Sequence, residues 1–373
     1  MNTVRDIKLV VYDRAERALP LVRSFLALEG PRAASYANEA ELGAMLARAR
    51  DEGLTSKQVL VLKRFLGRFF QVCPGSANVT CCRYRLINTG FNCLFNCTYC
   101  YLSSYLNSFG IVQFTNLDAA LDELASFQRS ADTSMVYRVG TGEFTDSLMM
   151  DEVTGFGRAI VSRAATMRNV MIELKTKSSR IDHLLDIREK GNAVLAWSLN
   201  TPRAIARYEE GAAGLDERLD AAARAVRAGY FVAFHFDPMI LYPGCEEEYE
   251  RVADSLFRAV DGQRVVWISL GCFRHSAGFR ESLREAFPDE DLTLAEMFPG
   301  PDGKLRYLAP RRKALFRRML ARIRAHSSAP YVYLCMEPRH VWEDVFGRSF
   351  ESNEELEADM SGHLIRTFGV SVR

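Results

Sequence analysis

The stretch GFNCLFNCTYCYL, residues 90–102, spaces three cysteines as Cys-x3-Cys-x2-Cys. Thiolates are soft ligands that suit iron–sulfur clusters, which are usually held by four cysteines. Three cysteines from one short loop can bind three irons of a cubane cluster and leave the fourth iron open to a small-molecule ligand. The spacing therefore predicts that Cys93, Cys97 and Cys100 are the protein ligands of a [4Fe–4S] cluster.

A zinc site is the alternative for the same cysteines, with Cys81, Cys82 or a histidine as the fourth ligand. Zinc sites usually pair two Cys-x2-Cys spacings, or combine cysteine with histidine at fixed offsets. Only one such pair occurs here, and the histidine nearest to Cys100 in the sequence is His183. The sequence therefore favours the iron–sulfur cluster.

Short apolar segments alternate with amphipathic helical patterns from about residue 83 onward. This alternation is typical of repeated βαβ units and of a parallel sheet. Segments such as Val-Leu-Ala-Trp (194–197) are wholly apolar, as expected for strands that helices cover from outside. The fold class is therefore predicted to be α/β, with the cluster loop directly after the first strand. The six predicted strands are residues 83–88, 134–140, 169–174, 193–200, 230–238 and 264–271.

The two ends of the chain are predicted to extend this α/β part. Residues 1–82 are expected to form a helical N-terminal extension, with one helix that ends near Gly53 and a basic amphipathic segment over 56–72. Residues 83–275 form the central part. Residues 276–373 are expected to form a C-terminal extension packed on it, with a basic helix, a strand and an acidic helix.

The cysteine spacing, with Tyr99 directly before Cys100, resembles that of the radical S-adenosylmethionine superfamily. An ordered series of segments further resembles the spore photoproduct lyase family over roughly residues 83–275. The resemblance implies a partial (β/α)6 barrel of the TIM type, with the active site at the C-terminal ends of its strands. The segments are CTYCYL (97–102), TK (176–177), IDHLL (181–185), WSLN (197–200) and RAVRAGY (224–230).

The resemblance also implies the chemistry. A [4Fe–4S] cluster would cleave S-adenosylmethionine reductively to a 5′-deoxyadenosyl radical, which takes a hydrogen atom from a nucleotide or nucleic-acid base. An external one-electron donor of the flavodoxin or ferredoxin type would supply the electron. The same machinery acting on a small metabolite or natural-product intermediate is a second hypothesis. A non-catalytic metal-binding protein that binds nucleic acid is a third hypothesis, of another class.

The family's functional positions fall on polar and aromatic residues near predicted strand ends. By the resemblance, Tyr99 and Tyr101 lie near the cluster, and Tyr101 relays a hydrogen atom. The cofactor's ammonium needs an acceptor and its carboxylate needs a cation, and Asp146 and Lys177 match the residues with these roles. The other cofactor-binding positions are Thr145, Ser198 and Asn200.

Glu143 departs from the family pattern. At this place the family has a cysteine that donates a hydrogen atom to the substrate radical, and a carboxyl O–H is a far poorer donor than a thiol. Glu143 is therefore expected to act as a fixed polar contact, to the cofactor's ammonium or to the substrate. A hydrogen-donating thiol would have to come from elsewhere, and the candidates are Cys81, Cys82, Cys272 and Cys335.

Composition gives few further constraints. The formal net charge of +1 points to no charged partner. No apolar run reaches the ~18–20 residues that a membrane helix needs. The N-terminus mixes acids and bases too early for a secretory signal. These features predict a cytoplasmic protein without a membrane partner.

Two further features allow two interpretations each. Residues 304–324 contain nine Lys or Arg and no acid. They either follow the phosphates of a nucleic acid or form a solvated helix face balanced by acidic segments such as CEEEYE (245–250). His235 and Asp237 lie two apart on a strand and so point to the same side of the sheet. Either residue could contact substrate, but a buried, hydrogen-bonded histidine is the favoured interpretation.

Overall fold

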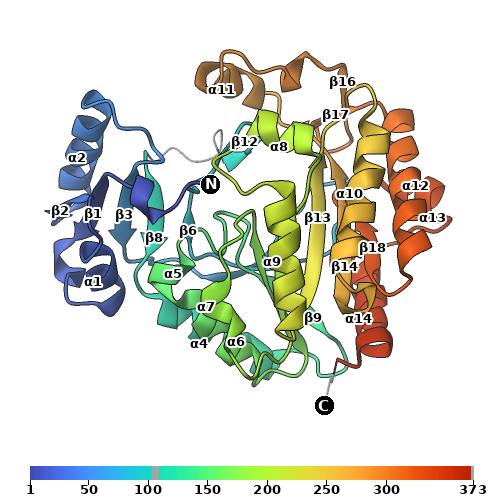
Figure 1. Ribbon diagram of the computed structural model, residues 1–373, viewed down its shortest axis with the longest axis horizontal. Helices are drawn as coiled ribbons and strands as arrows, with labels where there is room; N and C mark the ends of the chain where they lie inside the picture. Colours follow the sequence, from blue (N-terminus) through green and yellow to red (C-terminus); the bar gives the residue numbers. More distant parts are fainter. Residues whose placement is uncertain (103–108, 371–373) are drawn as a thin grey trace.

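The computed structural model describes residues 1–102 and 109–370, and its largest sheet forms the wall of an open half-barrel (Figure 1). Eight strands lie in the order β18-β14-β13-β11-β10-β9-β5-β4. All neighbours pair in parallel except β4 and β5. The six predicted strands are all confirmed. The strands are β4 Phe70–Val72, β5 Arg85–Ile87, β9 Tyr137–Gly140, β10 Val170–Thr176, β11 Ala193–Ser198, β13 Phe231–Met239, β14 Val265–Cys272 and β18 Tyr331–Leu334.

Helices between these strands cover the outer face of the sheet (Figure 1). The buried side of α9 is rich in alanine, including Ala221, Ala222 and Ala225, so this helix can lie close to β11 and β13. Larger side chains such as Tyr249 and Leu256 fill the space beneath α10. The helices are α4 Leu117–Ser130, α5 Asp151–Thr154, α6 Phe156–Ala164, α7 Asp182–Leu185, α8 Pro202–Tyr208, α9 Leu215–Arg227 and α10 Cys245–Ala259.

The N-terminal part corrects the prediction of a helical extension. It contributes three parallel strands to a second sheet with the order β2-β1-β3-β8-β6. The helical interpretation of 56–72 was wrong because Val59–Leu62 is a short apolar run that is buried throughout, as in a strand covered on both faces. The helix expected before Gly53 is confirmed as α2. The elements are β1 Leu9–Asp13, α1 Pro20–Leu26, β2 Arg32–Tyr36, α2 Glu39–Asp51, β3 Val59–Lys63, β6 Gly90–Phe91 and β8 Ile111–Phe114.

The C-terminal part adds β18 to the half-barrel and packs helices beside it (Figure 1). The basic helix α12 lies against α10, and its arginines pair with α10 carboxylates: Arg318 with Glu247 and Glu250, each at 2.7 Å, and Arg322 with Asp254. These pairs favour the charge-balanced interpretation of the basic segment. No helix in the described part is long and apolar enough to cross a membrane. The elements are β15 Arg274–His275, α11 Phe279–Ala286, β16 Met297–Pro299, β17 Leu305–Tyr307, α12 Ala309–His326, α13 Arg339–Phe346 and α14 Asn353–Phe368.

Residues 73–82 cross the open side of the half-barrel and join its two ends. The segment follows β4 at one edge of the sheet, and its Thr80 forms a β-bridge with Glu337, which lies just beyond β18 at the other edge. The Thr80 N–H donates to the Glu337 carbonyl at 3.0 Å, and the Cys81 N–H donates to Asn353 Oδ1 at 2.7 Å. The interior of the half-barrel is therefore walled on this side by a cysteine-rich segment.

The interior is organised around Glu173, whose side chain is fully buried. His235 Nε2 lies 2.6 Å from its Oε1, Trp267 Nε1 donates to the same oxygen at 2.9 Å, and the Tyr84 hydroxyl donates to Oε2. The interpretation of His235 as a buried, hydrogen-bonded residue is confirmed. Burial alone would raise the pKa of Glu173, but the attraction of His235 and the hydrogen bonds from His235 and Tyr84 lower it to about 2.

We expect Glu173→Gln to lower the free energy of unfolding by about 3–5 kcal/mol, because it removes one member of a buried pair. The folded-state pKa of about 2 lies below the ordinary value of 4.5. The contribution of Glu173 is therefore complete above about pH 4.5 and is lost as the pH falls toward 2. Urea unfolding measured across this range checks the expectation. The exposed control Glu189→Gln should change stability by less than about 0.5 kcal/mol, and an equal effect of both variants would contradict the account.

Candidate active site

The predicted cluster loop is held in place by a two-stranded sheet. Within the loop, β7 (Asn96–Cys97) pairs antiparallel with β12 (Glu209–Glu210), and the Thr98 N–H donates to the Tyr208 carbonyl at 2.8 Å. The Cys100 N–H donates to the Cys97 carbonyl at 3.1 Å, which closes the turn between the last two cysteines. The backbone of the loop is thus fixed to the segment that enters α9.

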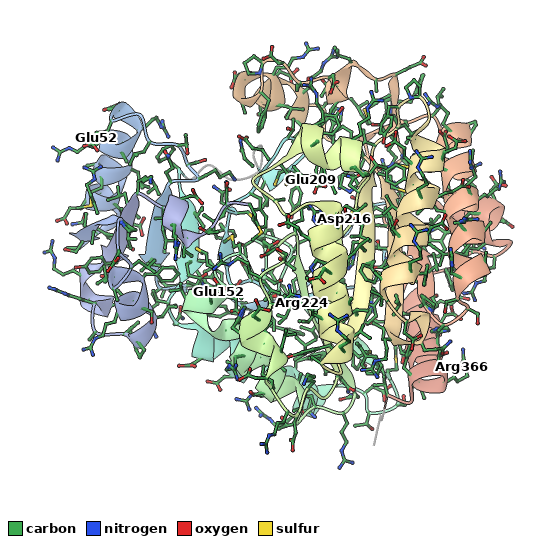
Figure 2. The ribbon with its side chains drawn as sticks, in the orientation of Figure 1. Glu52, Glu152, Glu209, Asp216, Arg224 and Arg366 are labelled. Atoms are coloured by element: carbon green, nitrogen blue, oxygen red, sulfur yellow. The ribbon has the colours of Figure 1, made fainter. Side chains whose placement is uncertain are left out.

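A buried ion pair lies beneath this loop. Glu209 pairs with Arg218 of α9, and the Tyr99 hydroxyl donates to the same carboxylate. Arg218 is fully buried and also donates to the carbonyls of Ser198 and Ala213, each at 2.9 Å. Figure 2 shows Glu209 above the N-terminal end of α9. Burial would raise the pKa of Glu209, but the charges of Arg218 and Lys177 and the hydrogen bonds from Tyr99 and Arg218 together outweigh it and lower the pKa.

The three predicted cluster ligands all lie on this one loop, and each is close enough to the next one along the chain for their charges to interact. Cys93 interacts with Cys97, and Cys97 interacts with Cys100. The Phe95 N–H donates to Cys93 Sγ at 3.4 Å, a contact that would stabilise a thiolate ligand. Burial raises the pKa of Cys93 and, despite the nearby Lys177 ammonium, raises that of Cys97 to about 12, so iron would have to displace protons from both.

The donor set and its spacing fit a cubane better than a single ion. Within residues 1–102 and 109–370, no three Cys, His, Asp or Glu side chains converge closely enough to hold one metal ion. A preformed tetrahedral zinc site would need four ligands about 2.0–2.3 Å from one point. Cys81 and Cys82, which were the candidates for a fourth zinc ligand, lie outside the cluster loop on the segment 73–82, where the Cys81 N–H donates to Asn353 Oδ1 at 2.7 Å.

Asp146 joins the ends of β9 and β10. Its Oδ1 accepts from the Thr176 hydroxyl at 2.6 Å and from the Leu148 N–H at 2.9 Å, while Oδ2 accepts from the Lys177 N–H at 2.7 Å. A carboxylate has about four acceptor positions, so one position remains for a cofactor group. Burial raises the pKa of Asp146 even though these hydrogen bonds lower it. Lys177 itself lies with Nζ 5.6 Å from the centre of the Tyr99 ring.

The other predicted cofactor-binding residues differ in how many of their hydrogen-bonding groups are free to contact a cofactor. Asn200 is 1% exposed, and its amide donates to Pro238 and Glu209 and accepts from Tyr249 and Thr201, so its hydrogen-bonding capacity is used within the protein. Ser198 lies at the end of β11 and is buried. Thr145 is buried with its hydroxyl 3.8 Å from Met149 Sδ. Their contacts with a cofactor stay predictions.

Glu143 is part of a polar group with Tyr101 and Lys175. The Tyr101 hydroxyl donates to Glu143 Oε1 at 3.2 Å and to its carbonyl at 3.0 Å, and Lys175 Nζ lies 3.8 Å from Oε2. Burial disfavours the charged form of Lys175, but Glu143, Glu173 and Asp237 outweigh it and raise the pKa. Glu143, the residue that was predicted to depart from the family pattern, is thus a carboxylate with an ammonium and a phenol as neighbours.

Sequence reasoning missed three residues of this site, Lys175, Glu209 and Arg218. Lys175 had a signal, because Glu173 and Lys175 are charged and two apart on an otherwise apolar strand, so that both face the interior. Glu209 and Arg218 had none. Both are residue types that usually lie at the surface. Arg218 is on α9 and Glu209 is on the short strand before it, and only the packing of the cluster loop buries them.

A family model for spore photoproduct lyase (SPL) matches residues 77–299, more than half of the chain. The chain belongs to the spore photoproduct lyase family. The enzyme of that name from Bacillus subtilis (strain 168) is 24% identical over 207 residues, which cover 55% of this chain and 60% of that protein. The one from Clostridium acetobutylicum is 25% identical over 229 residues, 60% of this chain and 65% of that protein. The chain therefore spans about three-fifths of the length of the curated relatives it matches.

Solved structures from the spore photoproduct lyase family share the fold. A mutant with bound AdoMet and dinucleoside spore photoproduct superposes with a TM-score of 0.75 at 23% identity, covering 88% of this chain and 98% of that one. A spore photoproduct lyase complexed with dinucleoside spore photoproduct gives the same TM-score and coverage. The predicted partial barrel is thus confirmed. The boundaries at residues 82 and 275 stay predictions, and strands β6 and β8 from the central part complete the N-terminal sheet.

We expect Glu209→Ala to lower the free energy of unfolding by about 3–5 kcal/mol, because it leaves the Arg218 charge buried without its partner. The loop should also lose its anchor, so that less iron is retained after reconstitution and gel filtration. Glu210→Ala is the matched control in the same strand, since Glu210 is exposed and its contact is with Asn96. Equal stability and equal iron content in both variants would show that the buried pair does not hold the loop.

Proposed function

We propose that this chain is a radical S-adenosylmethionine enzyme that acts on a nucleotide or nucleic-acid base. The observation that carries the proposal is the Cys93–Cys97–Cys100 loop, anchored beside the ends of the half-barrel strands in a chain of the spore photoproduct lyase family. When bound, a [4Fe–4S] cluster and S-adenosylmethionine would supply a 5′-deoxyadenosyl radical after one-electron reduction. An external donor of the flavodoxin or ferredoxin type would supply that electron.

The chain's own residues would bind and orient these groups. Cys93, Cys97 and Cys100 would hold three irons through thiolates. Lys177 would pair with the carboxylate of S-adenosylmethionine, and Asp146 holds Lys177 in position through its backbone N–H. The free acceptor position on Asp146 would receive the ammonium of the cofactor. The Tyr99 hydroxyl already donates its hydrogen bond to Glu209, so Tyr99 would help to hold the loop in place.

The substrate class rests on the family and on the polarity of the interior. Relatives include an enzyme whose structure contains a dinucleoside spore photoproduct. In this chain Glu143, Lys175, Asp237 and Arg274 offer carboxylates, an ammonium and a guanidinium in the interior, with Arg274 Nη1 3.1 Å from Asp237 Oδ1. A base carries donors and acceptors that such groups can bind. Membership of the family favours neither the small-metabolite hypothesis nor the non-catalytic one.

The test is conversion of S-adenosylmethionine to 5′-deoxyadenosine by the anaerobically reconstituted, dithionite-reduced protein, followed by chromatography. We expect product from the unmodified protein even without substrate. Cys93→Ala, Cys97→Ala and Cys100→Ala should each remove it, because each variant lacks one cluster ligand. Lys177→Ala should weaken cofactor binding by roughly 10-fold to 100-fold, which corresponds to the ~1.5–3 kcal/mol of a charge-assisted hydrogen bond.

Cys245→Ala is the control, because Cys245 is a buried thiol at the start of an outer helix. It should form 5′-deoxyadenosine like the unmodified protein. A reconstituted protein that carries iron and sulfide but forms no 5′-deoxyadenosine would rule out the proposed chemistry. Cofactor binding that is unchanged in Lys177→Ala would show only that Lys177 has been assigned the wrong role.

A further inference from the structure

A cavity of about 150 Å³ lies among β18, α12, α13 and α14, in the C-terminal part of the chain. It is at the start of β18, whereas the cluster loop lies beside the C-terminal ends of the parallel strands. Figure 2 shows Arg366, in the last turn of α14, far below Glu209, which lies on the strand that pairs with the cluster loop. We call this cavity the arginine pocket, and its polar lining consists of Arg324, Tyr331, Arg348, Asp359, His363 and Arg366.

Asp359 is the one carboxylate that lines the arginine pocket among the described residues, and its acceptor positions are largely taken. Arg348 donates to Asp359 Oδ1 at 3.2 Å and to Oδ2 at 2.9 Å, and the Tyr331 hydroxyl donates to Oδ2 at 2.6 Å. The charge of Arg348 is thus compensated, and Asp359 has little capacity left for a second guanidinium.

The other two arginines of the pocket have no such partner. Neither Arg324 nor Arg366 forms an ion pair with any residue in 1–102 or 109–370. Arg324 Nη1 donates to the carbonyls of Ser328 and Pro330, at 3.1 and 2.9 Å. These carbonyls satisfy an N–H group and hold the side chain in place, but they neutralise no charge. Two positive charges therefore remain uncompensated around one cavity.

His363, on the wall of the same pocket, shows the effect of these charges. Its Nε2 lies 2.7 Å from the Ala329 carbonyl, which can only accept, so Nε2 carries a hydrogen. Burial, reinforced by the charges of Arg324 and Arg366, lowers the pKa of His363, so the ring is neutral at pH 7. A bound anion would offset the repulsion among these groups.

The size and chemistry of the pocket favour a phosphate group. Pockets that enclose a drug-sized ligand measure about 300–1,000 Å³, so this cavity is suited to one compact group. Guanidinium groups bind the oxygens of carboxylates and phosphates through paired hydrogen bonds. A phosphate monoester carries about −1.5 to −2 charge at pH 7, which matches the two uncompensated arginines, whereas a carboxylate carries a single charge.

We propose that the arginine pocket binds the phosphate group of a small ligand, with Arg324 and Arg366 as its main contacts. The site is separate from the candidate active site, and the proposal does not depend on the proposed function. A substrate of the half-barrel would enter at the C-terminal ends of its strands, so its phosphates are not those that this pocket would hold. Inorganic phosphate and a phosphate ester share the required chemistry.

The test is isothermal titration calorimetry of the cluster-loaded protein with inorganic phosphate, against sodium chloride at equal ionic strength. We expect saturable binding of one phosphate per chain. Arg324→Gln and Arg366→Gln should each weaken it by about 10-fold or more, because each loses a charge-assisted hydrogen bond. Arg188→Gln is the matched control, since it removes the same charge from an exposed arginine outside the pocket. It should change the affinity by less than about 2-fold.

Asp359→Asn provides a gain that a folding defect cannot produce. The amide oxygen still accepts from the Tyr331 hydroxyl, while the negative charge is lost and Arg348 becomes available to the ligand. We expect this variant to bind phosphate about 3-fold more tightly or better.

Competition separates the sources of the phosphate group. Displacement of phosphate by thymidine 5′-phosphate would identify a phosphate ester as the ligand, and its failure to compete would identify the free anion. Displacement by thymidine would overturn the proposal, since no phosphate group would then be required. Displacement by a DNA duplex would also overturn it, because the arginines would then serve a nucleic acid.

Three results of the titration would overturn the proposal directly. The first is phosphate binding that is not saturable or that chloride reproduces. The second is an equal loss in Arg188→Gln and Arg366→Gln, which would mean that binding follows net charge alone. The third is Asp359→Asn protein that binds phosphate no more tightly than the unmodified protein. Formation of 5′-deoxyadenosine is not measured in this test, so its outcome is independent of the proposed function.

Discussion

The buried pair of Glu209 and Arg218 connects the parts on which the site depends. The Arg218 side chain, on α9, is fully buried. It donates a hydrogen bond to the Ser198 carbonyl at the end of β11 and pairs with Glu209 on β12, the strand that pairs with the cluster loop. Tyr99, from within the loop, binds the same carboxylate. One charge pair therefore fixes the cysteine loop to both a helix and a strand of the half-barrel. A buried charge without its partner costs several kcal/mol, so the loop and the barrel must assemble together.

The second constraint is that a half-barrel leaves its interior open on one side. In this chain the segment 73–82, which contains three cysteines, closes the opening through the Thr80–Glu337 bridge. The interior is thus lined by charged residues, Glu173, Lys175 and Asp237, and closed on its open side by this segment. Glu143 belongs to this charged group, since it contacts both the Tyr101 hydroxyl and the Lys175 ammonium.

The sequence predicted the half-barrel well because its strands are nearly continuous apolar runs, which only a sheet covered by helices can bury. It failed for residues 56–72, where an apolar run of a few residues among basic neighbours is compatible with either a helix or a strand, and only pairing with β1 and β8 decides. His235 was placed correctly because a histidine in an apolar strand needs a buried partner. Arg218 and Glu209 could not be found, since their burial is created by tertiary packing. The cysteines at 73, 81 and 82 were visible in the sequence as a cluster, but closure of the half-barrel by their segment depends on the Thr80–Glu337 bridge, which no local pattern indicates.

The central claim is that the three-cysteine loop holds a cluster with one iron open to S-adenosylmethionine. The most direct measurement is low-temperature electron paramagnetic resonance of the dithionite-reduced protein, recorded before and after S-adenosylmethionine is added. The account predicts the signal of a reduced [4Fe–4S] cluster whose g-values shift when the cofactor is added, because the cofactor becomes a ligand of the open iron. A protein with stoichiometric zinc and no such signal, or a cluster signal that the cofactor leaves unchanged, would contradict it.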